Sequence, residues 1–122
     1  MANVFPRRDL GERLLDYGAE IVALVEGLPR TLTGRHIGDQ LLRSATSVGA
    51  NYEEAQAAES RADFVHKLQI ALKEMRESHY WLRILARATA LPPEQLAKLV
   101  DESTQLRAIL SKAVATAKAN AQ

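Results

Sequence analysis

The spacing of hydrophobic residues along this 122-residue chain predicts four helices and no strands. In four segments, apolar side chains recur at steps of three and four residues, the period of an amphipathic helix. The segments cover residues 9–27, 35–58, 61–90 and 93–117. Because short connections make successive helices antiparallel, we expect an all-α, up-down-up-down four-helix bundle that occupies residues 1–122 as a single domain.

Residues that start and stop helices support the first two segments. Asp9 is placed to cap the first helix, and Gly27 and Pro29 supply its end. The loop that follows contains Thr33, which we predict to be the cap of the second helix.

The third and fourth segments carry their own signals. Ser60 and Asp63 resemble a capping box and place the start of the third helix just before Phe64. The Pro92-Pro93 pair ends this helix near Ala90 and begins the fourth, since proline is tolerated in a first helical turn but not in an interior. The tail from Lys118 onward is expected to fray.

Each predicted helix has an apolar face, and these faces together define the expected core. The core residues are Leu10, Leu14, Tyr17, Ile21, Leu24, Val25 and Leu28; then Ile37, Leu41, Ala45, Val48, Tyr52 and Ala55; then Phe64, Leu68, Ala71, Met75, Leu82 and Ala86; and finally Leu96, Leu99, Val100, Ser103, Leu106, Leu110, Ala113 and Ala117.

A second apolar side distinguishes the third helix. Ile70, Trp81 and Ile84 lie about 120° or more from the centre of its core stripe. Because monomeric proteins seldom expose contiguous apolar patches, we predict a subunit interface of a homo-oligomer here, with Glu77 beside it. The alternative is that the helix projects beyond its neighbours or that a loop covers the patch.

A third side of the same helix is basic. Its residues follow one another at alternating steps of three and four and therefore align in one stripe. They are His66, Gln69, Lys73, Arg76, Tyr80, Arg83 and Arg87. Arginines that flank an exposed tyrosine suit phosphate contact and base stacking, so we interpret Lys73, Arg76, Tyr80, Arg83 and Arg87 as candidate nucleic-acid contacts, with Arg43 joining them. The alternative is a solvated face whose arginines pair with acidic residues.

The charges of the chain are unevenly distributed, although the net charge is only +1. Residues 9–28 hold five acidic residues and one arginine, a net charge of −4, whereas residues 61–90 hold six basic and three acidic residues, a net charge of +3. The acidic first helix is therefore able to neutralise the basic third helix, within a subunit or across an interface.

Composition narrows the chemistry. The chain has no cysteine, which excludes disulfides, thiolate catalysis and cysteine-based metal sites. No apolar run approaches the ~20 residues that a membrane-spanning helix needs, and the N-terminus lacks a secretory signal, so we expect a cytoplasmic protein without a membrane partner.

Few residues suggest catalysis. A carboxylate-bridged metal pair requires two Glu-x-x-His motifs, and the nearest match is a single Asp63-x-x-His66. His79 is more readily interpreted as a hydrogen-bonded neutral imidazole than as a base. A second candidate set for a metal ion comprises Asn51, Glu54, Glu74 and Glu77 with His79. Such residues more often form a buried hydrogen-bond network or an interface salt bridge. We predict no catalytic residues, no metal and no cofactor.

Two motifs give the chain a family resemblance. One is QLLRSATSVGANYEEA at residues 40–55, and the other is DFVHKLQIALKE at residues 63–74, continued by ESHYWL at residues 77–82. The chain resembles the bacterial four-helix-bundle proteins named after the 23S ribosomal RNA intervening sequences, from about Leu28 through the fourth helix. It is also similar to the accessory variability protein of diversity-generating retroelements.

The resemblance implies an antiparallel bundle that assembles into a ring-shaped homopentamer. The retroelement relatives pair with a reverse transcriptase and bind nucleic acid through a basic surface. We therefore expect a non-enzymatic, oligomeric binding or scaffold module whose leading partner is RNA or an RNA–protein complex. The alternative is an adaptor that binds only a partner protein.

Overall fold

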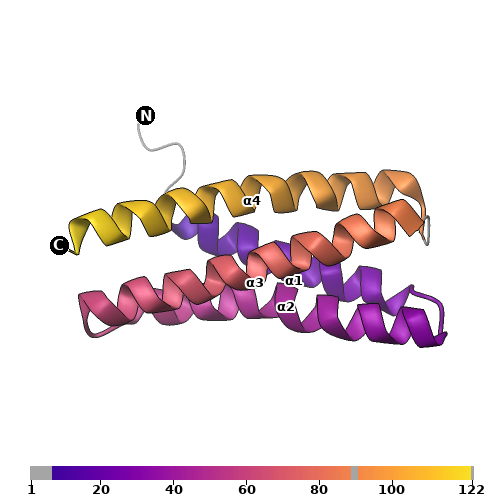
Figure 1. Cartoon of the computed structure of the whole chain (residues 1–122), viewed down its shortest axis with the longest axis horizontal. Helices are drawn as coiled ribbons and strands as arrows, with labels where there is room; N and C mark the ends of the chain where they lie inside the picture. Colours follow the sequence, from indigo (N-terminus) through magenta and orange to yellow (C-terminus); the bar gives the residue numbers. More distant parts are fainter. Residues whose placement is uncertain (1–6, 89–90, 122) are drawn as a thin grey trace.

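The computed structural model of the chain describes residues 7–88 and 91–121, which form four helices in an antiparallel bundle (Figure 1). The helices are α1 (Arg7–Glu26), α2 (Leu32–Gln56), α3 (Arg61–Ala88) and α4 (Pro93–Asn120). No strand occurs in the described part of the chain. The predicted all-α bundle with alternating helix directions is therefore confirmed.

Helix α2 begins earlier than predicted, because Thr31 and not Thr33 caps it. The hydroxyl oxygen of Thr31 accepts a hydrogen bond from the backbone N–H of Gly34 at 3.0 Å, whereas Thr33 lies inside the helix. A Cβ atom added at Gly34 would lie 2.0 Å from the carbonyl oxygen of Pro29, so only glycine fits this first turn. The Thr31 cap and the close fit of Gly34 against Pro29 together fix where the loop ends and α2 begins.

The other boundaries differ from the predictions mainly at the ends. Helix α1 already includes Arg7, so Asp9 lies within its first turn and not before it. The Ser60 hydroxyl accepts the Asp63 N–H at 3.1 Å, which confirms the predicted cap of α3, although the predicted end at Ala90 lies outside the described residues. Residues 118–120 belong to α4, so the predicted fraying is wrong there; the buried Ala117 holds that last turn against the bundle.

The core largely follows the predicted faces, and it differs most clearly near the end of α3. The buried Leu72 and Val114 were not predicted. Five residues predicted to be in the core are only partly buried, namely Leu10, Val25, Phe64, Val100 and Ala113. All six core residues predicted for α2 are buried. On α3, Leu82 and Leu85 are buried while Ala86 is exposed, so the assignment of Ala86 to the core is wrong. The inward residues of α3 follow a seven-residue repeat with alternating steps of three and four. After Leu82 this repeat requires a step of three, to Leu85, whereas the prediction took a step of four, to Ala86. This repeat runs through Leu68, Ala71, Met75, Ser78, Leu82 and Leu85.

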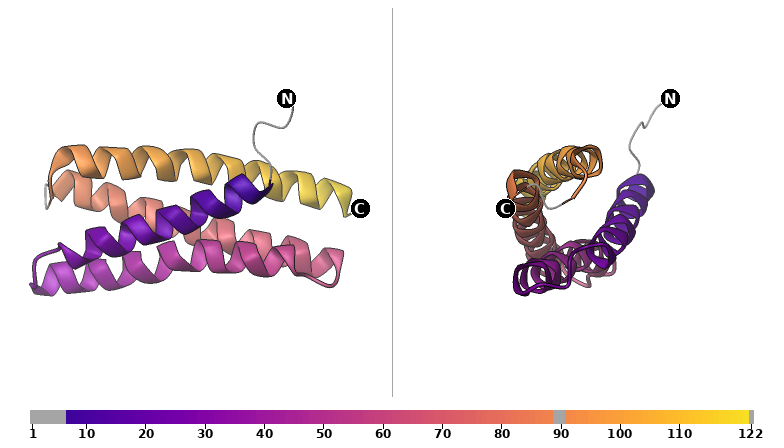
Figure 2. Two further views of the ribbon diagram at one scale, coloured as in Figure 1. Left: turned by 180° about the vertical axis from the view of Figure 1, so that it is seen from behind. Right: turned by 90° about the vertical axis from the view of Figure 1, so that its right-hand side faces the viewer.

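The helices are arranged in chain order around the bundle, but α1 and α4 approach each other much less closely than the other neighbours do. Viewed from its end, the bundle is an open arc with α1 and α4 at its two ends (Figure 2, right). Helices α1 and α3 lie diagonally and are not adjacent. The molecule therefore has one open edge, between α1 and α4, and an uncovered outer side of α3.

Candidate functional site

The outer face of α3, which we define as Lys73, Arg76, Tyr80, Arg83 and Arg87, is exposed along its whole length. Tyr80 is 55% exposed. Within residues 7–88 and 91–121, none of the four basic side chains forms an ion pair. The structure thus brings together five of the six predicted nucleic-acid contacts on one surface of one helix.

A shallow hollow of about 410 Å³ lies at the C-terminal end of this face. Its walls are formed by Tyr80, Arg83, Ile84, Arg87 and Ala88. One exposed aromatic ring and two guanidinium groups around a hollow can hold a flat ring and an anionic group at the same time. The arrangement has the chemistry of a nucleotide contact, in which a base stacks and a phosphate is neutralised.

The sixth predicted contact, Arg43, is engaged elsewhere. Its guanidinium on α2 donates to the carboxylate of Glu74 at 3.3 Å and to that of Glu77, both on α3. The hydrogen bond from Arg43 also lowers the pKa of the Glu77 carboxyl. Arg43 therefore joins α2 to α3, and its charge is already paired within the subunit.

The predicted interface residues are partly covered within the subunit. Trp81 donates its indole N–H to Glu77 at 3.2 Å and meets the His36 ring edge-on with centroids 5.9 Å apart. Trp81 and Ile84 pack against the edge of the core, and Ile70 is also half-buried. A side chain of α2, and not a loop, covers part of the apolar side of α3, and the part left exposed adjoins the hollow at Ile84.

The acidic first helix does not neutralise the basic third helix inside the subunit. No ion pair joins α1 to α3 among the residues that the structure describes, because the two helices lie across the bundle from each other. The only described ion pair of α1 runs from Arg13 to Glu102 of α4, at 2.7 Å. The charges of the outer face of α3 are therefore not compensated by α1 of the same chain.

Two buried polar pairs link the helices beneath this surface. The Ser78 hydroxyl donates to the Met75 carbonyl at 3.1 Å, so the Tyr17 hydroxyl donates to Ser78 at 2.9 Å. In the same way, Ser103 donates to the Val100 carbonyl, so Nδ1–H of His79 donates to Ser103 at 2.7 Å. Burial is the main cause that lowers the pKa of His79 and raises that of Tyr17.

Sequence reasoning anticipated one of these pairs in part. His79 is a hydrogen-bonded, buried imidazole, as predicted, but its partner Ser103 was not foreseen, nor was the contact of Tyr17 with Ser78. A serine at a core position of the helical repeat is the signal that was available, since a buried hydroxyl requires a partner.

The residues considered for a metal ion are held by other groups. Glu54 pairs with Lys67 at 2.8 Å, and the Asn51 amide donates to the Ser47 carbonyl of its own helix. Among the described residues, no three histidine or acidic side chains are arranged to hold a metal ion. The same residues contain no helix that is both long and apolar enough to cross a membrane.

Comparison with known proteins identifies the family. A family profile described as 23S rRNA-intervening sequence protein matches residues 12–112. A crystal structure of a protein of unknown function from the S23 ribosomal protein family of Bacteroides thetaiotaomicron is similar, with 38% sequence identity and a TM-score of 0.79 over 86% of this chain and 97% of the other. No curated protein matches the chain. The matched profile covers both sequence motifs, all of α2 and α3 and most of α1 and α4, and the chain belongs to the family of 23S rRNA-intervening sequence proteins.

Proposed function

We propose that this protein is a non-enzymatic, self-associating binding module that contacts RNA, alone or within an RNA–protein complex, through the outer face of α3. One observation carries the proposal: this face presents four basic side chains and a 55% exposed tyrosine, and none of the four forms an ion pair among the described residues. Unpaired guanidinium groups beside an exposed aromatic ring suit single-stranded RNA.

The geometry favours a single-stranded partner over a duplex. The hollow at Tyr80, Arg83 and Arg87 offers one aromatic ring for stacking, and a base is free to stack on that ring only where it is not paired and stacked inside a helix. Lys73 and Arg76 continue the basic surface toward the middle of α3, along which a phosphate backbone can run. Arg43 is left out of this surface because it is paired with Glu74 and Glu77.

The decisive test is the salt dependence of RNA binding. A variant in which Arg76, Arg83 and Arg87 are replaced by glutamine is titrated with a labelled single-stranded RNA oligonucleotide at several salt concentrations. Loss of three phosphate contacts reduces the slope of log K against log salt by about 2, since each contact contributes about 0.7 for single strands. Equal affinity and an unchanged slope would remove the proposal.

A matched control tests whether the position of the three positive charges matters, and not only their number. Replacing Lys98, Arg107 and Lys112 of α4 by glutamine removes the same charge from exposed positions, none of which lines the hollow. We expect this variant to retain most of the RNA affinity. A second pair, Tyr80→Ala and Tyr80→Phe, tests stacking: alanine costs about 1–3 kcal/mol per stacked base, whereas phenylalanine keeps the ring.

Self-association is proposed through the apolar side of α3, formed by Ile70, Trp81 and Ile84 with Glu77 at its edge. All three apolar residues remain only half-buried within one subunit. Assembly into a ring of five, as the family resemblance implies, would repeat the outer face of α3 around one particle. Several weak RNA contacts would then act together, which increases the overall affinity.

Light scattering tests the assembly. Trp81→Glu is expected to lower the particle mass, because an ionised carboxylate in an apolar contact loses its hydration without gaining a partner. Because Trp81 also packs within the subunit, Ile70→Glu serves as a second variant, and Leu15→Glu on α1, which is 65% exposed, serves as the control. An unchanged mass for both α3 variants would contradict the interface.

A partner protein is the second candidate. The mixed character of the hollow favours it, since Ile84 lies between two arginines there and a partner with an acidic and apolar surface would also fit. Affinity purification with and without nuclease separates the two candidates. Partners lost after nuclease treatment favour RNA, whereas partners that are retained favour the protein-only adaptor.

A further inference from the structure

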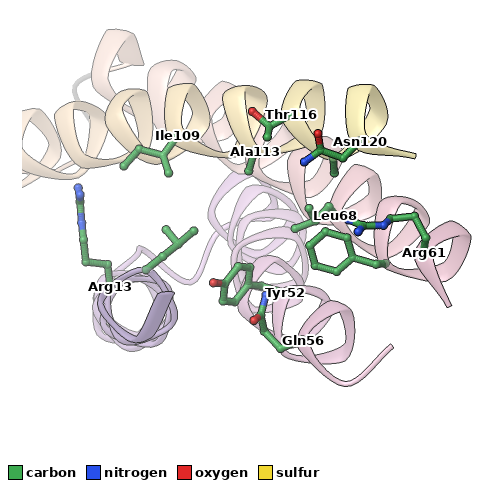
Figure 3. A pocket seen from close by; sticks show the side chains of 12 residues that line it. Arg13, Tyr52, Gln56, Arg61, Leu68, Ile109, Ala113, Thr116 and Asn120 are labelled. Carbon is green, nitrogen blue, oxygen red and sulfur yellow. The ribbon is translucent and has the colours of Figure 1, made fainter. Parts of the chain in front are cut away.

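The open edge between α1 and α4 contains a cavity of about 340 Å³, to which all four helices contribute (Figure 3). Its floor is apolar and is built from Leu10, Phe64, Leu68, Ile109 and Ala113. At the volume of liquid water, about 30 Å³ per molecule, this space would hold roughly ten waters, most of them against hydrocarbon. Displacing such water by an apolar group is favourable.

An ion pair bridges α1 and α4 at one side of the cavity. The Arg13 guanidinium of α1 makes two hydrogen bonds to the Glu102 carboxylate of α4, at 2.7 and 3.1 Å, and a third to Gln105 at 3.3 Å. Figure 3 shows Arg13 extending from α1 toward α4 at one side of the cavity. The two long polar side chains span the gap between α1 and α4, the helix pair that is less closely packed than the other neighbours.

The opposite side of the cavity is polar and positively charged. Arg61, the first residue of α3, lies there with Asn120 of α4, and both line the cavity (Figure 3). Arg61 is exposed and forms no ion pair with any described residue. Among the described side chains that line the cavity, two are arginines and none is Asp or Glu.

We propose that this cavity binds a small amphipathic carboxylate, with its hydrocarbon chain on the apolar floor and its carboxylate on Arg61. A guanidinium group binds a carboxylate through two parallel hydrogen bonds, which suits an anionic head better than a neutral or cationic one. The Asn120 amide offers a further donor beside it.

The size of the cavity selects a small molecule over a helix from a partner. Small-molecule sites occupy about 300–1,000 Å³, and this cavity is near the lower limit of that range. A helix with side chains is about 10–12 Å across and would have to displace α1 or α4. The proposal does not depend on RNA binding, because the cavity lies at the N-terminal end of α3 and the hollow at Tyr80 lies near the other end.

Calorimetric titration with octanoate, below the concentration at which it forms micelles, tests the proposal on the intact chain. We expect saturable binding at one site per chain and a rise in melting temperature with ligand concentration. Octan-1-ol and octylamine have the same chain with a neutral and a cationic head, and acetate has the head without the chain. Each should bind at least about tenfold more weakly, since a charge-assisted pair and the apolar contact are both required.

Two variants locate the site. Arg61→Gln should weaken octanoate binding about tenfold while Arg107→Gln, an exposed arginine of α4 outside the cavity, should leave it unchanged. Ala113→Phe fills the half-buried floor and should abolish binding without unfolding the chain, which circular dichroism checks. Octanoate binding that is unaffected by both Arg61→Gln and Ala113→Phe would overturn the proposal.

Three further outcomes would also overturn it. Equal affinity for octanoate and octan-1-ol would indicate apolar adsorption without recognition of the head. Heat signals that never saturate would indicate the same. A lower particle mass for Ala113→Phe, together with no octanoate binding to the parent chain, would identify a second copy of the chain as the occupant of the cavity.

Discussion

The inner and outer faces of α3 both contain polar residues, but those on the inner face are paired, whereas the basic residues on the outer face form no ion pair with any described residue. On the inner face, the buried Ser78 and His79 each have a protein partner, and no buried side-chain nitrogen or oxygen is left without one in the described part of the chain. On the outer face, Arg76 and Arg83 are exposed and lack ion pairs. Substitutions should therefore affect stability on one side and binding on the other.

The reason for this contrast is the cost of dehydration. A buried polar group without a partner loses its hydrogen bonds to water and gains none, which costs about 1–3 kcal/mol. An exposed arginine keeps its hydration and costs the fold little, even without a carboxylate beside it. The positively charged side chains of the outer face are thus free to bind a ligand.

The largest expected effect on the free energy of unfolding is that of replacing Leu82, whose neighbour Arg83 lies on the opposite face of α3 and serves as the comparison. Leu82 is fully buried, and Leu82→Ala should reduce the free energy of unfolding by about 2–5 kcal/mol through lost contacts and a residual cavity. Arg83→Ala, at the next position and exposed, should change it by less than about 0.5 kcal/mol. Urea denaturation measures both, and similar losses for the two variants would contradict the contrast.

The buried pair of Tyr17 and Ser78 should respond unequally to removal of its two hydroxyls. Ser78→Ala leaves the buried Tyr17 hydroxyl without a partner and should cost about 1–3 kcal/mol of unfolding free energy. Tyr17→Phe leaves Ser78 bonded to the Met75 carbonyl and should cost only about 0.5–1.5 kcal/mol. The double variant, compared with the sum of the single ones, gives their coupling energy in denaturation experiments.

The pH dependence of stability tests the buried His79. Its pKa in the folded chain is lowered by burial and, less strongly, by Arg107 and Arg83, so the unfolded state binds the proton more readily. The histidine therefore costs no stability at neutral pH, and stability is lost as pH falls from about 6.5 toward the lowered pKa, by at most about 1.4 kcal/mol per pH unit for one proton.

Thermal denaturation of the parent chain and of His79→Gln between pH 7 and pH 5 measures the loss of stability that protonation of His79 causes. Glutamine does not titrate in this range, so the difference in melting temperature between pH 7 and pH 5 should be smaller for the variant. His66→Gln, on the exposed side of α3, is the control. If the parent and His79→Gln lose stability equally, the buried histidine is not the cause.

Among the paired polar residues, the smallest effect on stability is expected for Arg43, which is an ion-paired arginine on the surface. Arg43→Gln should lower the free energy of unfolding by about 0–1 kcal/mol, because its pairs with Glu74 and Glu77 are solvent-exposed. It should also raise the pKa of Glu77 toward its ordinary value, which NMR titration of that carboxyl measures. RNA affinity that falls as far with Arg43→Gln as with Arg83→Gln would show that the paired arginine contributes to binding.

Much of the fold was readable from the spacing of residues along the chain. The apolar period on α2 predicted the six buried hydrophobic side chains from Ile37 to Ala55 but not the buried Gly38 and Ser44, since a helix that must bury one stripe repeats its apolar residues at every turn. The capping serine at Ser60 was equally readable, because its partner lies three residues away. Basic residues on α3 could be assigned to one face for the same reason.

The errors arose where several local choices were possible. Thr31 and Thr33 are both able to cap a helix, and Gly34, fitted against the Pro29 carbonyl, decides between them only in the folded loop. Ala86 lies on the predicted stripe by a four-residue step, yet α3 follows a seven-residue repeat that buries Leu85 in its place. Which repeat prevails depends on the neighbouring helices.

By itself the sequence determined the helices, their inward faces and the alignment of the basic residues, because all of these depend on neighbours within a few positions along one chain segment. Only the tertiary structure decided that Arg43 is paired while Arg76, Arg83 and Arg87 are not, that His79 meets Ser103, and that Arg13 and Glu102 bridge α1 and α4 beside a cavity. Each depends on how closely two separate helices approach and at which register, and side-chain spacing within one helix does not fix that distance.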